Sequence, residues 1–360
     1  MDYKIEISDT IDEKIWNSKL LENKASTTYQ TGNWLSAYDR ELGFKPIFIL
    51  IRNSSDQIVG QLAAKILNDL RWTNPLIKKI GNKLDLGISL TWNFGPIIHD
   101  SKNYDKILEQ ILKGIEKVAK LNHVTMITGS IPPLSTNNSE KSFKSFGYQS
   151  RKWGTYITNL NTDVEKLYSL LDKKTRYDIR KTEKLNLDFE VAKERSAVEK
   201  YFLLKLKSRD ELNSVILEHP MKDEHWENLY KKGFEKVFLV KNNEEVVGGI
   251  FTLVFGGNVI QHGVVNSEMK ELQGGSFLIW NMIKWLNKEK FSTFDVGGIN
   301  PNPTTKKEEQ IKFFKSKWNG IQYNYPIYTK FLSKKNHYLL YVLKKLTKKH
   351  TPTDSITQRK

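Results

Sequence analysis

The stretch from Phe291 to Gly320, FSTFDVGGINPNPTTKKEEQIKFFKSKWNG, combines an acid, two glycines and a late lysine in a pattern that could do chemistry. Asp295 ends a short apolar run, and Gly297 and Gly298 follow it. Glycine lets the backbone approach a ligand closely, and functional side chains often lie where strands pass into loops. Lys315, late in the helix that follows, completes a plausible site. The alternative is that Asp295 only caps a turn and that Lys315 is a solvated lysine.

Two elements must position these side chains. The run Phe291–Val296 predicts a short buried strand, and a polar loop with two prolines follows it. A helix is predicted from about Lys306, and it carries Phe314 and Lys315 near its end. The sequence therefore predicts Asp295 and Lys315 as catalytic residues, with Gly297, Gly298 and Phe314 lining a substrate site.

A second set of residues could bind an anion. The predicted helix from Asp172 to Lys184, DKKTRYDIRKTEK, places Lys173, Arg176, Arg180 and Lys184 at spacings of three, four and four. These spacings put the four cations on one helical face. Arginine binds phosphate through paired hydrogen bonds, so a diphosphate or an RNA backbone is a natural ligand. A solvated face, relieved by nearby acidic residues, is the alternative.

Composition limits the class of protein. The 360 residues include 57 Lys and Arg against 41 Asp and Glu, a formal net charge of +16, which favours polyanionic partners. There are no cysteines, and the seven histidines form no HxH or HxxxH pair, so we expect neither a thiol nucleophile nor a metal site. No apolar run approaches the ~18 residues that span a bilayer, and no export signal begins the sequence.

The order of predicted elements occurs twice. A strand, polar turn and strand with a Val-Gly pair fills Ile47–Leu67 and again Val237–Phe255. Three further matches follow in the same order: the helix at Tyr104–Leu121 with Phe277–Lys290, the strand at Val124–Ile131 with Phe291–Val296, and FKS at Phe143–Ser145 with Phe314–Ser316. Four matches in the same order imply a duplicated α/β domain.

We therefore expect an α/β (α+β) protein of two similar domains, each a mixed twisted sheet flanked by helices, over residues 1–160 and 161–330. Residues 331–360 are predicted to form a basic amphipathic helix and a disordered tail. Trp34, on a helix expected near Gly32, is predicted to bind substrate as part of an aromatic wall, although such residues are more often core. The loop Gln273-Gly274-Gly275-Ser276 lacks the glycine spacing of a pyrophosphate loop.

The sequence resembles the Fem-type (FemABX) aminoacyltransferases, which add amino acids to peptidoglycan precursors from aminoacyl-tRNA. The matching pieces cover most of residues 20–330: TTYQTGNWLSAY, TYITNL followed by LDKKTRYDIRKTEK, EEVVGGIF, and FDVGGI with FFKSKWNG. The resemblance implies two tandem GNAT-like acyltransferase domains, with the acceptor on the first and the acyl donor on the second. The long helical hairpin of some members is absent from the sequence.

By this resemblance, Arg176 and Arg180 would hold the diphosphate of the precursor. Lys315 would steady negative charge on the ester carbonyl or the terminal adenosine of the donor, and Asp295 would orient the amine or Lys315. The implied activity is direct attack of an amine on an activated ester, with no cofactor and with aminoacyl-tRNA as co-substrate. The acceptor would be a phosphate-bearing, lipid-linked envelope precursor, handled in the cytoplasm or at the inner face of an anionic membrane.

Two other functions remain open at this point. One is an N-acyltransferase of the GNAT superfamily that uses acyl-CoA as its donor. The other is a basic RNA-binding protein that has kept the fold without catalysis, for which strongly salt-dependent binding would be the signature.

Overall fold

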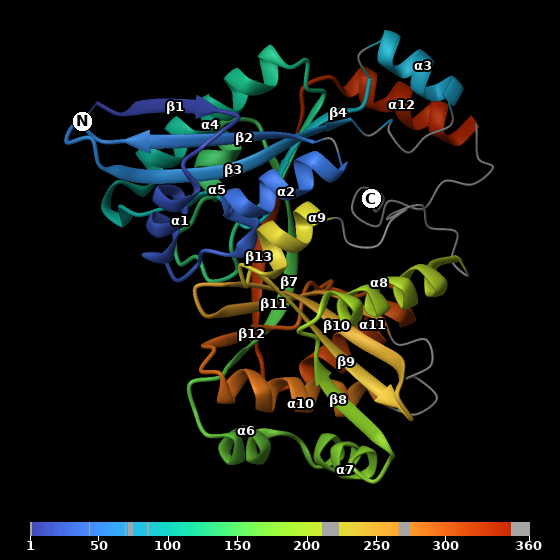
Figure 1. Cartoon of the computed structure of the whole chain (residues 1–360). Helices are drawn as coiled ribbons and strands as arrows, with labels where there is room; N and C mark the ends of the chain where they lie inside the picture. The colour runs from blue at the N-terminus through green and yellow to red at the C-terminus, as the bar shows by residue number, and fades with distance from the viewer. Residues whose placement is uncertain are drawn as a thin grey trace. The chain divides into compact units, whose positions relative to one another are not determined.

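The computed structural model describes residues 2–42, 44–68, 70, 75–84, 86–210, 223–265 and 274–346. Within these ranges the chain forms two compact units. Of the described residues, unit 1 contains those up to Arg151 and the C-terminal segment from Pro326, and unit 2 contains those of 152–210, 223–265 and 274–325. Both are mixed α/β structures, as the sequence predicts, and Figure 1 shows their helices and strands.

Unit 1 is a mixed sheet with helices on both faces. Its strands lie in the order β1-β2-β3-β4-β6-β13, and the short β5 pairs with β3. The strands are β1 Lys4–Ser8, β2 Lys45–Arg52, β3 Ile58–Asn68, β4 Ile88–Trp92, β5 Ile97–Ile98, β6 Met126–Ser130 and β13 Ile321–Phe331. The helices are α1 Glu13–Leu21, the 3-10 turn Thr28–Gln30, α2 Gly32–Leu42, α3 Pro75–Lys83, the 3-10 turn Ser101–Asn103, α4 Tyr104–Leu121, α5 Glu140–Ser145 and α12 Lys334–Leu346.

Alternation along β2 explains why both faces of this sheet are covered. Ile49 and its odd-numbered neighbours pack in the core cluster with α4, and a Cβ on Gly114 of α4 would lie 3.2 Å from Ile49. The intervening Phe48 points to the other face and contacts Trp16 of α1 edge-on, with ring centroids 5.2 Å apart. Successive strand residues face opposite sides, so one apolar strand can serve two helix layers.

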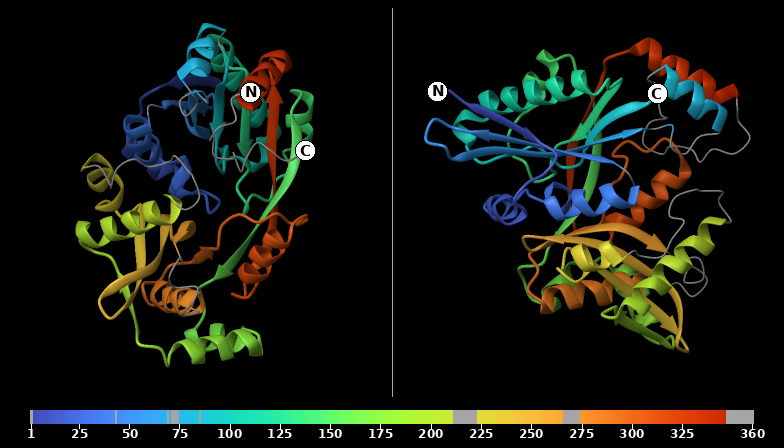
Figure 2. Two further views of the ribbon diagram at one scale, coloured as in Figure 1. Left: turned by 90° about the vertical axis from the view of Figure 1, so that its right-hand side faces the viewer. Right: turned by 45° about the horizontal axis from the view of Figure 1, so that its top comes forward.

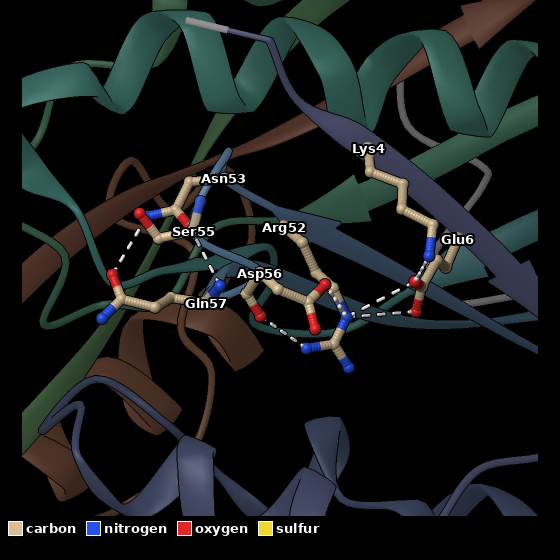
Figure 3. Close-up of polar contacts among 7 residues, drawn as sticks. All are labelled: Lys4, Glu6, Arg52, Asn53, Ser55, Asp56 and Gln57. Atoms are coloured by element: carbon tan, nitrogen blue, oxygen red, sulfur yellow. Dashed lines mark hydrogen bonds and ion pairs between the residues drawn. The ribbon is translucent and has the colours of Figure 1, made fainter.

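The turn between β2 and β3 confirms the predicted hairpin (Figure 3). The side chain of Asn53 accepts hydrogen bonds from the backbone N–H groups of Ser55 and Gln57, at 3.0 and 2.9 Å. Asp56 adopts a φ of 60°, which Asp tolerates better than most residues. Arg52 pairs with Glu6 on β1 at 3.4 Å, which links the first two strands.

Unit 2 repeats this architecture. Its strands lie in the order β8-β9-β10-β11-β12-β7. The strands are β7 Gln149–Asn159, β8 Leu187–Val191, β9 Glu235–Asn242, β10 Glu245–Phe255, β11 Asn258–Val265 and β12 Thr293–Asp295. The helices are α6 Val164–Leu170, α7 Lys173–Thr182, α8 Arg195–Asp210, α9 Asp223–His225, the π-helical turn Trp226–Tyr230, α10 Gly274–Lys288 and α11 Lys306–Ser316. Trp285 of α10 packs on one face of the sheet against Phe238, and Tyr201 of α8 packs on the other against Phe251.

The two sheets have matching pairings, which confirms the duplication. In each, three antiparallel pairings are followed by one parallel pairing, β4 with β6 and β11 with β12, and then by an antiparallel last strand. The last strands are exchanged between the halves. β7 follows β6 in the chain but pairs with β12, and β13 follows β12 but pairs with β6.

Three features of the fold differ from the sequence prediction. The strand region predicted over Leu90–His99 is two strands, β4 and β5, separated by a turn in which Phe94 has a φ of 49°. Strand β13 was not predicted, because Pro326 within it argues against a sheet-interior strand. The compact units divide inside β7 and β13, whereas the repeat placed divisions at 160 and 330. In the described residues no helix is long and apolar enough to cross a bilayer.

Candidate functional site

Asp295 is held in the sheet of unit 2 by strand pairing on both sides. It pairs in parallel with Ile260 of β11 and antiparallel with Ile157 of β7, and only 5% of its surface is exposed. One oxygen, Oδ1, accepts a hydrogen bond from the N–H of Gly297 at 2.7 Å and another from the hydroxyl of Thr155. The carboxylate therefore fixes the turn that follows its own strand.

The two glycines of this turn are required by close packing. Gly297 has a φ of +79°, and a Cβ there would lie 2.9 Å from the carbonyl oxygen of Gln261 and 3.4 Å from Nζ of Lys315. A Cβ on Gly298 would lie 2.5 Å from Nε1 of Trp153. Only glycine fits both the left-handed conformation and the contact with Gln261. The turn thus packs closely against β11, β7 and the side chain of Lys315.

Lys315 approaches the turn from helix α11. This helix begins with a capping box, in which the Thr305 hydroxyl oxygen accepts a hydrogen bond from the N–H of Glu308 and the Glu308 carboxylate accepts one from the N–H of Thr305. Because the capping box fixes the residue at which α11 begins, it also fixes which residues of its last turn face the Gly297-Gly298 turn. Nζ of Lys315 donates to the carbonyl oxygen of Gly298 at 3.0 Å. The sequence-predicted pair, Asp295 and Lys315, therefore meets at the Gly297-Gly298 turn.

Burial shifts both ionisable groups toward neutrality. It raises the pKa of Asp295 to about 6, although the hydrogen bonds from Thr155 and Gly297 favour the ionised form and the charge of Lys315 does so too. Burial also lowers the pKa of Lys315 to about 8, and the Asp295 carboxylate partly opposes this shift. Desolvation is the larger effect in each case. At pH 7 the site therefore holds an ionised acid beside a lysine that can lose its proton near pH 8.

The sheet changes register where these groups lie. The parallel pairing of β11 with β12 runs from Asn258–Thr293 to Ile260–Asp295, while β11 continues to Val265. Against β10, the register of β11 shifts between Gln261 and Gly263, which leaves His262 as an extra residue. Bulges of this kind re-aim backbone groups and often lie next to active sites.

Phe314 extends the site toward the start of α10. Its ring packs edge-on against Trp318, with centroids 5.9 Å apart, and is 37% exposed. A Cβ on Gly275 would lie 3.6 Å from the Phe314 ring. The glycine loop considered in the sequence now opens α10 with Gly274, Gly275 and Ser276, and Gln273 lies outside the described residues. Backbone N–H groups at a helix start attract anions, and an exposed ring can stack on a base.

Three of the four predicted cations, Lys173, Arg176 and Arg180, lie on the outer face of α7, whereas Lys184 lies in the turn after it, because the helix ends at Thr182 and not at Lys184 as predicted. The residues of α7 that are buried are Thr175, Ile179 and Thr182, whereas Lys173, Arg180 and Lys184 are exposed. The half-buried Arg176 donates from one nitrogen to the carbonyl oxygens of Ser169 and Leu171, at 2.8 and 2.6 Å. Arg176 thus caps the end of α6 as well as belonging to the cationic face.

Helix α7 is tied to the end of α11 by an ion pair between Asp178 and Lys317, 3.4 Å apart. Asp178 lies away from the cationic face of α7. Among the described residues, no hydrogen bond or ion pair joins that face to Asp295 or Lys315. Trp34, the remaining predicted substrate residue, belongs to α2 of unit 1, where it is buried and packs edge-on against Tyr29 at 5.3 Å.

Two residues of the site were missed in the sequence. Thr155, whose hydroxyl bonds to Asp295 and to the carbonyl oxygen of Gly297, and Trp153, which contacts Gly298, both lie on β7. Their segment reads as the last strand of the first repeat, 140 residues before Asp295. Only the exchange of β7 into the second sheet brings them to the site.

Comparison with known proteins agrees with this fold. Residues 171–307 match the family model described as the acetyltransferase (GNAT) domain. No curated protein matches the sequence. A crystal structure of FemX is 12% identical, with 96% of this chain and 100% of that chain covered, at a TM-score of 0.69.

Two further solved structures have the same fold. The C-terminal domain of a putative lysylphosphatidylglycerol synthetase from Agrobacterium fabrum is 11% identical, with 92% of this chain and 96% of that chain covered and a TM-score of 0.54. A tandem GNAT protein from the clavulanic acid biosynthesis pathway is 9% identical, with coverages of 92% and 100% and a TM-score of 0.56. These matches support an acyltransferase in general. Residues 171–307 are similar to a GNAT domain, and the chain as a whole has a tandem GNAT-like fold similar to that of FemX.

Proposed function

We propose that this protein is a Fem-like aminoacyltransferase, which moves an aminoacyl group from an aminoacyl-tRNA ester to an amine of a phosphate-bearing envelope precursor. The observation that carries the proposal is the arrangement of Asp295, the Gly297-Gly298 turn and Lys315, a buried acid and a lysine joined by a fixed backbone turn. An ester donor needs stabilisation of a developing oxyanion, and this arrangement supplies a cation for it.

In the proposed reaction the acceptor amine attacks the ester carbonyl carbon, forming a C–N bond. The carbonyl oxygen gains negative charge, which the ammonium of Lys315 stabilises. The C–O bond to the terminal ribose then breaks, and the ribose oxygen takes up the proton that the amine nitrogen loses. Asp295 is a positioning residue in this scheme, since its oxygen is occupied by the N–H of Gly297 and the hydroxyl of Thr155. Phe314 and the start of α10 are proposed to hold the terminal base and phosphate of the donor.

The cationic face of α7 is proposed to bind the phosphates of the acceptor. Reversing two exposed charges, Arg180→Glu with Lys184→Glu, should raise the KM for the acceptor about tenfold and leave kcat within about twofold. The rise should shrink at high salt, because exposed charges are screened. Lys200→Glu on α8, also exposed, is the control. An unchanged KM in the double variant, or an equal rise in the control, contradicts the assignment.

Arg176 is less suited to this test than Arg180. Its guanidinium bonds to two backbone carbonyls at the end of α6, so Arg176→Ala also removes a structural contact. If Arg176→Ala lost activity, its melting temperature would have to be measured as well, to show whether the variant is still folded.

The identity of the acyl donor most needs a direct experiment. Purified protein is incubated with an amine acceptor and either charged tRNA or an acyl-CoA, and the product is followed by mass spectrometry. The proposal expects transfer from the aminoacyl ester. Acyl-CoA is the second candidate donor, favoured by the match of residues 171–307 to an acetyltransferase domain. Transfer from acyl-CoA alone would overturn the aminoacyl assignment and keep the acyltransferase.

A further inference from the structure

Helices α3 and α12 form a pair at the edge of unit 1. The two helices are in contact and lie side by side in every view (Figures 1 and 2). They are held by a small apolar cluster of Leu70, Ile77, Leu86 and Leu340, with Leu339 and Leu343 packed against it. The basic C-terminal helix predicted from the sequence therefore packs on its own domain through its leucine side.

The outer side of α12 carries a regular stripe. The exposed residues Lys334, Tyr338, Tyr341 and Lys345 follow one another at spacings of four, three and four, which puts them on one helical face. Tyr338 is 68% exposed, an unusual position for a large ring. The face thus presents two aromatic rings between two lysines.

Helix α3 adds exposed aliphatic side chains. Leu76, Ile80 and Leu84 lie at spacings of four on one face of the helix and its final turn, and Leu76 is 61% exposed. Lys79 and Lys83 accompany them on that side. Single exposed apolar residues are ordinary, but three in register beside lysines are typical of an interaction surface.

The charge of the pair is of one sign. Neither helix contains Asp or Glu, and together they contain seven lysines. These are Lys78, Lys79, Lys83, Lys334, Lys335, Lys344 and Lys345. Of the six whose side chains the structure describes, none takes part in an ion pair with another described residue. Their charge is available to an external anion.

We infer that the α3–α12 pair is a docking surface for an anionic lipid bilayer. Lysines attract anionic headgroups, while tyrosine rings and aliphatic side chains enter the headgroup and acyl boundary. An RNA site would need the cations but has no use for Leu76, Ile80 and Leu84. The inference goes beyond the proposed transfer reaction and does not depend on it, since the surface shares no residue with the Asp295–Lys315 site.

The test measures sedimentation of the full chain with vesicles, at low and physiological salt. Vesicles of phosphatidylcholine with one third phosphatidylglycerol should retain the protein, and vesicles of phosphatidylcholine alone should not. Lys334→Glu with Lys345→Glu should weaken binding at least tenfold. Tyr338→Ser with Tyr341→Ser, which leaves the charge unchanged, should weaken it severalfold. Melting curves show whether each variant is folded.

The matched control is Lys113→Glu with Lys117→Glu, the same charge change on exposed positions of α4 in the same unit. Equal weakening in this control would mean that net charge alone attracts the vesicles and would overturn the inference. Binding that survives the lysine variant, or that is as strong to phosphatidylcholine alone, would also overturn it. The inference would also be overturned if the lysine variant kept its binding to vesicles and lost binding to RNA in a parallel binding assay. Failure of the transfer assay leaves this result unaffected.

Discussion

Lys315→Ala is expected to lower kcat/KM for aminoacyl transfer about 100-fold, in the range found when one donor to an oxyanion is removed. The physical reason is that the ammonium provides the only charge that approaches the Gly297-Gly298 turn from α11 in the described residues. The fold should survive, because Lys315 is half-buried and its side chain makes one hydrogen bond, to the carbonyl of Gly298. The measurement is steady-state kinetics with a melting curve for each variant.

Lys315→Arg distinguishes the two ways in which Lys315 can act. Its pKa of about 8 means that the cation is lost as pH rises through 8, so wild-type activity that needs the cation falls there. Arginine stays charged, and this variant should keep part of the activity without the decline above pH 8. Taking the ratio of wild type to variant at each pH cancels the titration of the acceptor amine. If Lys315 instead accepts a proton as a base, the arginine variant will be as inactive as the alanine variant.

Asp295→Asn should raise the stability of the protein at pH 8 and lower its transfer activity. The folded pKa of Asp295, about 6, is above its ordinary value of 3.8, so its ionisation opposes folding. This cost is absent below about pH 4, grows as pH rises, and is complete above pH 6, where it is on the order of 3 kcal/mol. An asparagine keeps an oxygen that can accept from Gly297 and Thr155 without the buried charge. The variant should therefore melt higher than wild type at pH 8 and equally at pH 4.

The same variant should lose activity, by about tenfold, because the carboxylate no longer favours the charged form of Lys315. Because Lys315, with a pKa of about 8, is charged at low pH with or without this carboxylate, the loss should be seen near pH 8 and should fade toward pH 6. Melting curves at pH 4 and pH 8 and initial rates at pH 6 and pH 8 check the two effects. Asp178→Asn, on the ion pair with Lys317, is the control for loss of a carboxylate nearby. A variant that is less stable at pH 8 than at pH 4, relative to wild type, contradicts this reasoning.

Much of the candidate site was predictable because its residues are close in the sequence. Asp295, Gly297 and Gly298 are consecutive or nearly so, and a strand end followed by glycines has a recognisable pattern. Lys315 follows within one helix, whose capping signal Thr305–Glu308 is also local. Thr155 had no such signal, since a threonine in a strand looks the same whether it bonds to a buried acid or to nothing.

The sequence by itself determined most of the helices and strands and the duplication, because these depend on periodicity and on local spacing, and its resemblance to Fem-type enzymes implied the GNAT-like class. Tertiary structure alone decided which strands are neighbours. A period of two tells which side chains share a face, but not which strand lies beside it. The exchange of β7 and β13 therefore left no trace in the pattern, although it brings Thr155 to Asp295. The packing of α12 on α3 was open for the same reason, since an amphipathic helix shows that it will bury a face without showing against what.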